Sequence, residues 1–484
     1  MEFLNFSTIM VGLITVLNIL FALIVIFVER RDVSSVWAWL LVLFFLPILG
    51  FIVYIFFGRQ LKQKNFYKLS NEERHFLREA VNEQIDQLDH SDLNEKPMLQ
   101  KYADLIRMNL KSSNAFLSDD NDITIFHDGK DKFDSLFADI RAAKKEINIQ
   151  YYIIQRDSLA EKLRDELTKT AKEGVMVRVL YDEVGSRRMS RAFFKELLEN
   201  GGEVEVFFPS FLKLINLRIN NRNHRKLCII DGKIAYIGGF NIGNEYLGLN
   251  KRFGNWRDTH LRIKGEAVNH IQGRFILDWK QATNQEKIDY EAYSMNQSRY
   301  HANSMIQIIS SGPNSRTEHL KNMYLKLIMS AKKSVYIQSP YFVPDGSFMD
   351  ACKMALLSGI DVRIMIPSKP DHPFVYWANL AYAGELLSYG AKILQYNNGF
   401  LHAKTIVVDQ EVASVGTTNI DMRSFRLNFE VNAIIYDKKI AQHLYDLFEE
   451  DSRESLDLTL EQYEKRSGWV RFKESISRLL SPIL

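Results

Sequence analysis

One polar pattern occurs twice in this chain and constrains its fold more than any other feature. Residues 224–231 read HRKLCIID and residues 402–409 read HAKTIVVD, so a His, a Lys and an Asp recur at the same spacing. Because a repeated sequence marks a repeated structural unit, the pattern predicts two homologous lobes. The candidate site residues are His224, Lys226, Asp231, His402, Lys404 and Asp409, followed by Asn241 and Asn419 at the ends of two small-residue turns.

Segments before each copy repeat as well. Residues 143–150 (AKKEINIQ) resemble 331–338 (AKKSVYIQ), and 174–180 (GVMVRVL) resemble 359–365 (GIDVRIM). Each lobe therefore alternates helix and strand, which favours a mainly parallel sheet with helices on both faces and active residues at strand ends. The predicted fold class is α/β, with two homologous α/β/α sandwich lobes at 111–300 and 301–484 related by pseudo-twofold symmetry.

The spacing within each copy has a chemical meaning. The apolar residues of both copies are typical of a buried strand, on which side chains at i and i+2 share a face. Each His is therefore expected beside its Lys. A nearby ammonium disfavours the protonated imidazole and keeps it available as a nucleophile, while the ammonium itself suits a phosphate oxygen.

Carboxylates in and after the copies have other expected roles. Asp231 and Asp409 lie an odd number of residues from the His and Lys and so face away, and the Asp231-Gly232 pair is a turn signal. A nucleophilic His also needs an acceptor on its other ring nitrogen. Asp258 and Glu430 follow the two copies at similar distances and are candidates. A solvated carboxylate at a strand edge is the structural alternative for both.

Pseudo-twofold symmetry would bring the two histidines together in one cleft. One imidazole would then attack a substrate while the other donates a proton to the leaving group. Two independent sites are the alternative, which we disfavour because each half alone lacks an acid for the leaving group.

Composition limits the other classes of function. The net charge of +3 over 484 residues is too balanced to indicate a polyanion as partner. The two cysteines, Cys228 and Cys352, lie in apolar runs, which indicates a reducing compartment and excludes a disulfide scaffold. Because no Cys/His cluster has metal-ligand spacing, we predict neither a metal nor another cofactor.

The first 60 residues have the composition of a transmembrane hairpin. Residues 9–28 and 36–57 are apolar and uncharged, and a helix of about 20 such residues crosses the hydrocarbon core of a bilayer. A cleaved signal peptide is disfavoured because Glu2 replaces a basic start and a second span follows at once. Residues 61–110 are expected to form a polar helical connector.

The distribution of cations predicts the orientation of this hairpin. The turn between the spans holds Arg30 and Arg31, whereas five cations follow the second span, namely Arg59, Lys62, Lys64, Lys68 and Arg74. By the positive-inside rule, the chain is a multi-pass protein of the cell membrane with its lobes in the cytoplasm.

Two more segments have the character of a lipid surface. Apolar residues recur at helical spacing from Trp469 to Ile483 among Arg471, Lys473 and Arg478, as in an interfacial helix. Packing of that helix on its own lobe is the alternative. Residues 207–219 combine apolar and basic side chains directly before the first copy, and are either core or a path for a lipid into the site.

The duplicated His-x-Lys-x4-Asp motifs and their Asn-ending turns resemble the phospholipase D superfamily. The two-span start, residues 221–226 (NRNHRK) and residues 256–258 (WRD) resemble the bacterial cardiolipin synthases within it. Gly239 stands where many superfamily members have Ser, whereas Thr417 keeps a hydroxyl at that position of the second copy.

The resemblance implies transfer of a phosphatidyl group from one phosphatidylglycerol to another, giving cardiolipin and glycerol. His224 would attack phosphorus, and His402 would protonate the departing glycerol and then deprotonate the incoming alcohol. Asp258 and Glu430 would orient the imidazoles. The nonbridging oxygens would be held by Lys226, Lys404, Asn241 and Asn419.

The implied partners are phosphatidylglycerol and anionic membrane lipids, without nucleic acid, and a homo-oligomer is left open. A phospholipase D-type phosphodiesterase that passes the same intermediate to water is the main alternative. A phosphodiesterase of nucleic acids would need a strongly basic groove, and a nonenzymatic membrane scaffold is the third class. The sequence identifies neither the leaving headgroup, which phosphatidylethanolamine would also supply, nor which His is the nucleophile.

Overall fold

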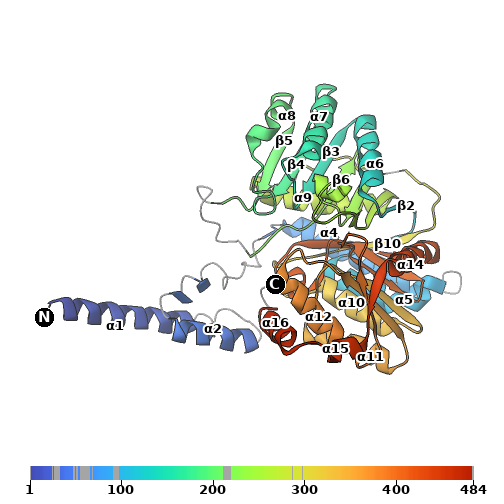
Figure 1. Ribbon diagram of the computed structural model, residues 1–484. Coiled ribbons are helices and arrows are strands. Elements are labelled where there is room, and N and C mark those ends of the chain that lie inside the picture. The colour runs from blue at the N-terminus through green and yellow to red at the C-terminus, as the bar shows by residue number, and fades with distance from the viewer. Residues whose placement is uncertain are drawn as a thin grey trace.

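The structure, a computed structural model of the chain, describes residues 2–23, 26, 33–46, 49–50, 53–54, 66–67, 69–90, 97–210, 220–285, 287–296 and 298–481. Two lobes lie one above the other in Figure 1, and two N-terminal helices extend to one side. The chain has a mixed α/β fold of two lobes, each built around one sheet.

The N-terminal helices are α1 (Glu2–Leu23), α2 (Val33–Phe45), α4 (Asn71–His90) and α5 (Pro97–Ser113). The next elements are β1 (Leu117–Ser118), β2 (Asn121–Phe126), α6 (Gly129–Ala142), β3 (Glu146–Tyr151), α7 (Ser158–Lys172), β4 (Met176–Asp182), η4 (Arg191–Phe194), α8 (Lys195–Glu199), β5 (Glu203–Phe207), β6 (Leu227–Ile230), β7 (Ile234–Gly238), η5 (Asn244–Leu247), β8 (Trp256–Arg257), β9 (His260–Gly265), α9 (Ala267–Thr283) and η6 (Tyr290–Ala292). The remaining elements are β10 (Met305–Ser311), α10 (His319–Ser330), β11 (Ser334–Gln338), β12 (Phe342–Val343), α11 (Gly346–Leu357), β13 (Asp361–Pro367), α12 (Pro373–Leu387), β14 (Lys392–Tyr396), β15 (Phe400–Leu401), β16 (Thr405–Val408), β17 (Val412–Gly416), β18 (Ile420–Asp421), α13 (Met422–Arg426), β19 (Glu430–Tyr436), α14 (Lys438–Arg453), β20 (Ser455–Leu458), α15 (Leu460–Glu464) and α16 (Gly468–Leu479).

Both sheets mix parallel and antiparallel strands. Within the described residues, the first has seven strands in the order β2-β9-β7-β6-β3-β4-β5, and the second has nine in the order β1-β10-β19-β17-β16-β11-β13-β14-β20. Only β3-β4-β5 and β11-β13-β14 are parallel runs within them. The prediction of mainly parallel sheets was wrong, because residues 231–233 and 409–411 are too short for a crossover and force antiparallel hairpins.

The lobes share one hydrophobic core. Helices α6, α7 and α8 cover the outer face of the first sheet, and α5, α10, α11 and α12 cover that of the second. The inner faces of both sheets pack together with α9 and α14 in a single cluster. Strands such as β3 and β16 are therefore buried on both faces, which explains their continuous apolar sequence.

Corresponding helices of the two lobes begin in the same way. Asp157 precedes α7 and its carboxylate accepts hydrogen bonds from the N–H groups of Leu159 and Ala160. Asp345 precedes α11 and accepts one from Phe348 N–H. A carboxylate at this position satisfies backbone donors that a first helical turn leaves unpaired, so each Asp sets the start of its helix.

The last residue of each repeated motif closes a hairpin. Asp231 and Asp409 both have φ of 53° in the turns after β6 and β16. The Asp231 carboxylate accepts hydrogen bonds of 2.7–3.1 Å from the backbone N–H groups of residues 144–146. That of Asp409 does the same, at 2.7–3.1 Å, with residues 332–334. The two aspartates thus tie the hairpins to the starts of β3 and β11.

Helices α1 and α2 contact each other, and α5 packs on α10 and β10 of the second lobe (Figure 1). Strand β1 also joins the second sheet, so residues that precede the first lobe in the sequence belong to the sheet of the second lobe. The expected polar connector is helical at α4 and α5. Of the apolar and basic segment 207–219, residues 211–219 lie outside the described residues, as do most of the cations that flank the expected hairpin.

The two expected spans are described in part. Positions 24–25, 27–28, 47–48, 51–52 and 55–57 lie outside the described residues. Among the residues that are described, no helix combines the length and the apolar character needed to cross a membrane.

We expect Asp231→Asn to destabilise the first lobe. An amide cannot replace a carboxylate that accepts several backbone bonds, and charge-assisted bonds contribute about 1.5–3 kcal/mol. The melting temperature of the detergent-solubilised protein should fall by roughly 2–6 °C. Asp122→Asn, at an exposed position of β2, is the matched control and should leave it unchanged. Equal melting of the two variants would contradict the structural role of Asp231.

Candidate active site

The two motifs meet where the lobes join. His224 and Lys226 lie directly before β6, and His402 and Lys404 lie directly before β16, rather than inside the strands as the apolar pattern suggested. Because β6 and β16 run antiparallel to β3 and β11, these positions fall at the carboxyl ends of the parallel strands. That edge of an α/β sheet is where binding sites form.

Main-chain bonds between the lobes fix both motifs and explain why they leave the strands. The backbone N–H of His224 donates to Phe429 O at 2.9 Å, and that of His402 donates to Arg257 O at 2.7 Å. Strand β8 pairs in parallel with β15 next to the second contact. Each motif therefore enters its sheet from a position set by the opposite lobe.

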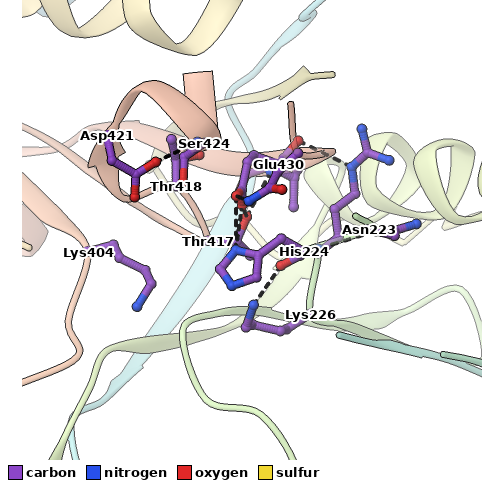
Figure 2. Close-up of polar contacts among 12 residues, drawn as sticks. Asn223, His224, Lys226, Lys404, Thr417, Thr418, Asp421, Ser424 and Glu430 are labelled. Carbon is purple, nitrogen blue, oxygen red and sulfur yellow. Dashed lines mark hydrogen bonds and ion pairs between the residues drawn. The ribbon is translucent and has the colours of Figure 1, made fainter. Parts of the chain in front are cut away.

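The carboxylates that follow these contacts cross between the lobes. His224 Nδ1 lies 3.0 Å from Glu430 Oε2 (Figure 2), and His402 Nδ1 lies 2.6 Å from Asp258 Oδ2. Asp258 belongs to the lobe of the first motif and Glu430 to that of the second. Each imidazole thus has its acceptor from the other lobe, a pairing that the linear order of the residues does not reveal.

The ionisation of the carboxyls determines the tautomer of both imidazoles. Burial alone would raise the pKa of Glu430, but His224, Lys226 and the Thr417 hydroxyl hold it below its usual range. Burial would likewise raise the pKa of Asp258, but Lys404 and His402 hold it below its usual range. A carboxylate can only accept, so Nδ1 carries the hydrogen in each ring and Nε2 presents its lone pair.

The lysines are buried beside the imidazoles. Lys226 Nζ donates to His224 O at 2.6 Å, and Lys404 Nζ donates to His402 O and lies 2.9 Å from His402 Nδ1. Burial and the charge of Lys404 together lower the pKa of Lys226 to about 7, although Glu430 acts to raise it. Burial likewise lowers the pKa of Lys404 to about 8, against Asp258 and Glu430. Because lysines of different motifs influence each other, the motifs form one electrostatic site.

Both imidazoles are neutral at neutral pH. Burial lowers the pKa of His224 to about 4 and that of His402 to about 3, and the lysines of both motifs add to the effect. Each histidine is 8 % exposed, whereas Lys226 is fully buried, so the rings are the parts of the motifs that solvent reaches. Ring contacts with Tyr152 at 4.8 Å and Trp256 at 5.2 Å restrict their rotation.

The two downstream asparagines differ in their contacts. Asn241 accepts from Ile153 N–H at 3.1 Å and donates to the Tyr246 hydroxyl at 3.0 Å, so its amide holds the chain after β3. Asn419 is 4 % exposed, and its Oδ1 has no partner among the described residues. The second copy therefore leaves a polar atom uncommitted where the first does not.

The residues that open the two turns differ for a steric reason. Thr417 Oγ1 donates to Glu430 Oε2 at 2.5 Å, so its hydroxyl serves the carboxylate. At the equivalent position of the first copy, a Cβ added to Gly239 would lie 1.9 Å from Asp258 Oδ1. Asp258 occupies the space of a side chain at 239, which explains the glycine.

Sequence reasoning missed the groups that hold the neighbours of His224. Asp278 of α9 accepts from Arg225 at 2.7 Å, from Gln150 at 2.7 Å and from the Tyr67 hydroxyl at 2.6 Å. Its pKa is about 2, because Arg225 and other partners outweigh its burial. The signal in the sequence was faint, a single acidic residue within the apolar run 275–279.

The second lobe repeats part of this arrangement. Asp451 of α14 accepts from Gln338 at 2.7 Å and from Arg257 at 2.9 Å, and Arg257 is the residue whose carbonyl receives His402 N–H. Among the described residues, no group of three or more His, Cys, Asp or Glu side chains is placed to hold a metal ion.

Comparison with known proteins identifies the family of the chain. A family model described as "Cardiolipin synthase, PLD-like domain" matches residues 136–279 and 324–452, one segment for each motif. A second, "Phospholipase_D-nuclease N-terminal", matches residues 16–59. The chain is 54% identical over 483 residues to the major cardiolipin synthase ClsA of Bacillus subtilis (strain 168), which covers 99% of this chain and 100% of the relative. The chain belongs to the cardiolipin synthase family.

Other members of the cardiolipin synthase family are similarly close. The cardiolipin synthase of Listeria innocua is 52% identical, with 98% of each chain covered. That of Staphylococcus aureus (strain Mu50) is also 52% identical, covering 97% of this chain and 95% of the relative. Among solved structures, the phosphatidylserine synthase of Haemophilus influenzae has a TM-score of 0.60 at 17% identity. It covers 79% of this chain and 100% of its own, which shows a shared fold.

The lysine pKa values predict how phosphodiester turnover by this cardiolipin synthase family member depends on pH. A lysine whose pKa is lowered keeps its charge only below that pKa, so kcat/KM should fall as the pH rises past about 7 to 8. Lys226→Arg should move this alkaline limb upward, toward the pKa of Lys404 of about 8, because a guanidinium stays protonated. Lys195→Arg, on the exposed α8, should not. A pH–rate profile with unchanged alkaline limbs in both variants would refute the assignment.

Gly239→Ser should displace Asp258 from His402 and lower turnover by roughly 10²- to 10⁴-fold, the contribution of a positioned general acid or base. Gly273→Ser in α9 is the matched control, since no atom lies within 4 Å of its added Cβ. Both variants are compared by initial rate and by melting temperature. Wild-type activity in Gly239→Ser would mean that the carboxylate is not confined as described.

Proposed function

We propose that this chain is a phosphatidyltransferase that joins two phosphatidylglycerol molecules into cardiolipin and releases glycerol. Its membership of the cardiolipin synthase family supports this reaction. The observation that carries the mechanism is the pair of histidines whose Nδ1 atoms contact carboxylates from opposite lobes. Two imidazoles whose Nε2 atoms have no hydrogen-bond partner among the described residues, together with two lysines, suit a reaction that forms and then breaks a phosphorus–nitrogen bond.

In the first step, His224 Nε2 attacks the phosphorus of one phosphatidylglycerol. The bond from phosphorus to the headgroup oxygen breaks, and that oxygen takes a proton from His402 Nε2. Glycerol leaves, and a phosphatidyl group remains on His224. Glu430 keeps its contact with Nδ1 and stabilises the positive charge that develops on the ring.

In the second step, His402 Nε2 takes the proton of a hydroxyl on the headgroup of a second phosphatidylglycerol. The oxygen attacks phosphorus, the phosphorus–nitrogen bond breaks, and cardiolipin leaves. His402 is then protonated and His224 neutral, as they were when the first substrate was bound. Double displacement splits one difficult substitution into two easier ones.

The charge of the substrate accounts for the proton on His402. Without substrate this imidazole is neutral, because burial and Lys404 lower its pKa to about 3. A phosphodiester anion between Lys226 and Lys404 offsets their charge and raises the pKa of His402, so that Nε2 takes up a proton from solvent before the first step. Each lysine ammonium donates one N–H to the backbone carbonyl of the histidine in the same motif. Its other N–H groups remain for the nonbridging oxygens. Asn241 and Asn419 would complete this contact.

We further propose that residues 1–60 form a membrane-spanning hairpin that places the lobes in the cytoplasm. The match of residues 16–59 to an N-terminal family model supports membrane association. Ile9 and Leu13 of α1 and Trp37 and Phe44 of α2 are exposed, as expected of helices in contact with lipid. Anionic lipids including phosphatidylglycerol would then surround the site, with neither nucleic acid nor a metal taking part.

A substrate whose leaving group needs no proton, phosphatidyl-p-nitrophenol, tests which histidine is the nucleophile. His402→Ala should release a rapid, stoichiometric burst of nitrophenolate and accumulate a phosphatidyl adduct, because it cannot activate the acceptor alcohol. His224→Ala should give no burst. Alkaline quenching preserves the phosphorus–nitrogen bond, and peptide mass analysis then locates the adduct. An adduct on His402 in the His224→Ala protein would reverse the two roles, and one on another residue would refute the mechanism.

With natural phosphatidylglycerol, the wild-type protein should form cardiolipin and glycerol in equal amounts, measured by lipid mass spectrometry. Phosphatidic acid without cardiolipin would assign the chain to hydrolysis instead.

A further inference from the structure

Helix α16 packs on the second lobe through its polar side. Glu474 and Ser477 are its buried residues, and Arg478 bonds to Glu385 of α12 at 2.7 Å and lies over the ring of Tyr382 at 4.7 Å. The sequence left open whether this helix contacts a membrane or packs on its own lobe. The helix packs on the lobe through one polar face only, and its other faces are left for another contact.

The apolar side of α16 faces outward. Trp469, Phe472, Ile476 and Leu479 are 65, 53, 38 and 76% exposed, and their spacing places them on one stripe of the helix. A helix on a globular domain ordinarily turns such a stripe toward the core. Isolated exposed apolar residues are common on protein surfaces, whereas a continuous stripe marks a contact.

The chemistry of this stripe fits a lipid surface. Trp469 and Phe472 stack at 5.4 Å, and Lys473 lies 5.5 Å from the ring of Trp469 and 4.8 Å from that of Trp377. Arg471 is exposed beside them. Aromatic rings bordered by cations favour the headgroup region of an anionic bilayer. In Figure 1, α16 lies on the side of the second lobe from which α1 and α2 extend.

We propose that α16 lies in the headgroup region of the membrane and holds the second lobe against the bilayer, as a contact separate from the N-terminal helices. This inference rests on the proposed function, because the lipid substrate lies in the same bilayer. The contact sets the distance from the junction of the lobes to the headgroups. It therefore governs how readily bilayer lipid enters the site and leaves the chemical steps unchanged.

A lipid-borne quencher tests the contact in the full-length protein. Cys228 and Cys352 are buried, so a cysteine introduced as Phe472→Cys takes up an environment-sensitive dye selectively. Leu357→Cys, 74% exposed at the end of α11, is the matched control. In vesicles of phosphatidylglycerol and phosphatidylethanolamine, the dye at 472 should be quenched at least about threefold more strongly than the dye at 357. Equal quenching, or energy transfer between labelled copies without lipid quenching, would overturn the proposal.

Kinetics provide the second test. The variant Trp469→Ser/Phe472→Ser/Leu479→Ser should raise the apparent KM for phosphatidylglycerol in vesicles by roughly five- to tenfold at unchanged kcat, and should match the wild type on detergent-dispersed substrate. Met329→Ser/Met354→Ser/Leu357→Ser, at exposed positions of α10 and α11, should match it in both. Unchanged kinetics in vesicles, or equal losses in vesicles and detergent, would overturn the membrane contact. A wild-type protein that forms no cardiolipin in either setting would instead refute the proposed function.

Discussion

The proposed active site depends on hydrogen bonds that neither lobe can make alone. Glu430 and Asp258 are fully buried, and each contacts an imidazole of the opposite lobe. A hydrogen bond to a buried charged group contributes about 1.5–3 kcal/mol, so these contacts hold the lobes in register at the proposed site. The same contacts set the tautomer of both rings. A change that weakens the interface would therefore also alter the reactivity of Nε2.

The charges of the site are balanced in a way that favours an anionic substrate. Two buried carboxylates face Lys226 and Lys404. The pKa values of these lysines are about 7 and 8, so without substrate their ammonium groups lose a proton easily. A phosphodiester that enters supplies negative charge, which raises the pKa values of both lysines and of the imidazoles. In the proposed mechanism, substrate binding thus prepares the acid and the base, and a neutral molecule of similar size would not.

The sequence was sufficient for the two-lobed frame, the paired motifs and the turn at Asp231, because each depends on local spacing. It was misleading about the sheets, where the short hairpin at residues 231–233 overrides the helix–strand alternation. It did not reveal that Asp258 and Glu430 cross between lobes, since that pairing is set by main-chain contacts between distant segments. Nor did it reveal Asp278, whose partners come from three separate parts of the chain.

The two halves of the site are not equivalent, and their differences favour the roles proposed for the histidines. Lys404 Nζ lies 2.9 Å from His402 Nδ1, and an ammonium at that distance destabilises the imidazolium and makes it the stronger acid. A stronger acid suits the ring that protonates the departing alcohol. Glu430 accepts hydrogen bonds from the side chains of Thr417 and Asn428, whereas Asp258 accepts one from the backbone N–H of Thr259, so side-chain donors hold the acceptor of His224. A fixed acceptor suits the ring that bears the covalent phosphorus–nitrogen bond, because positive charge develops there and must be stabilised without movement.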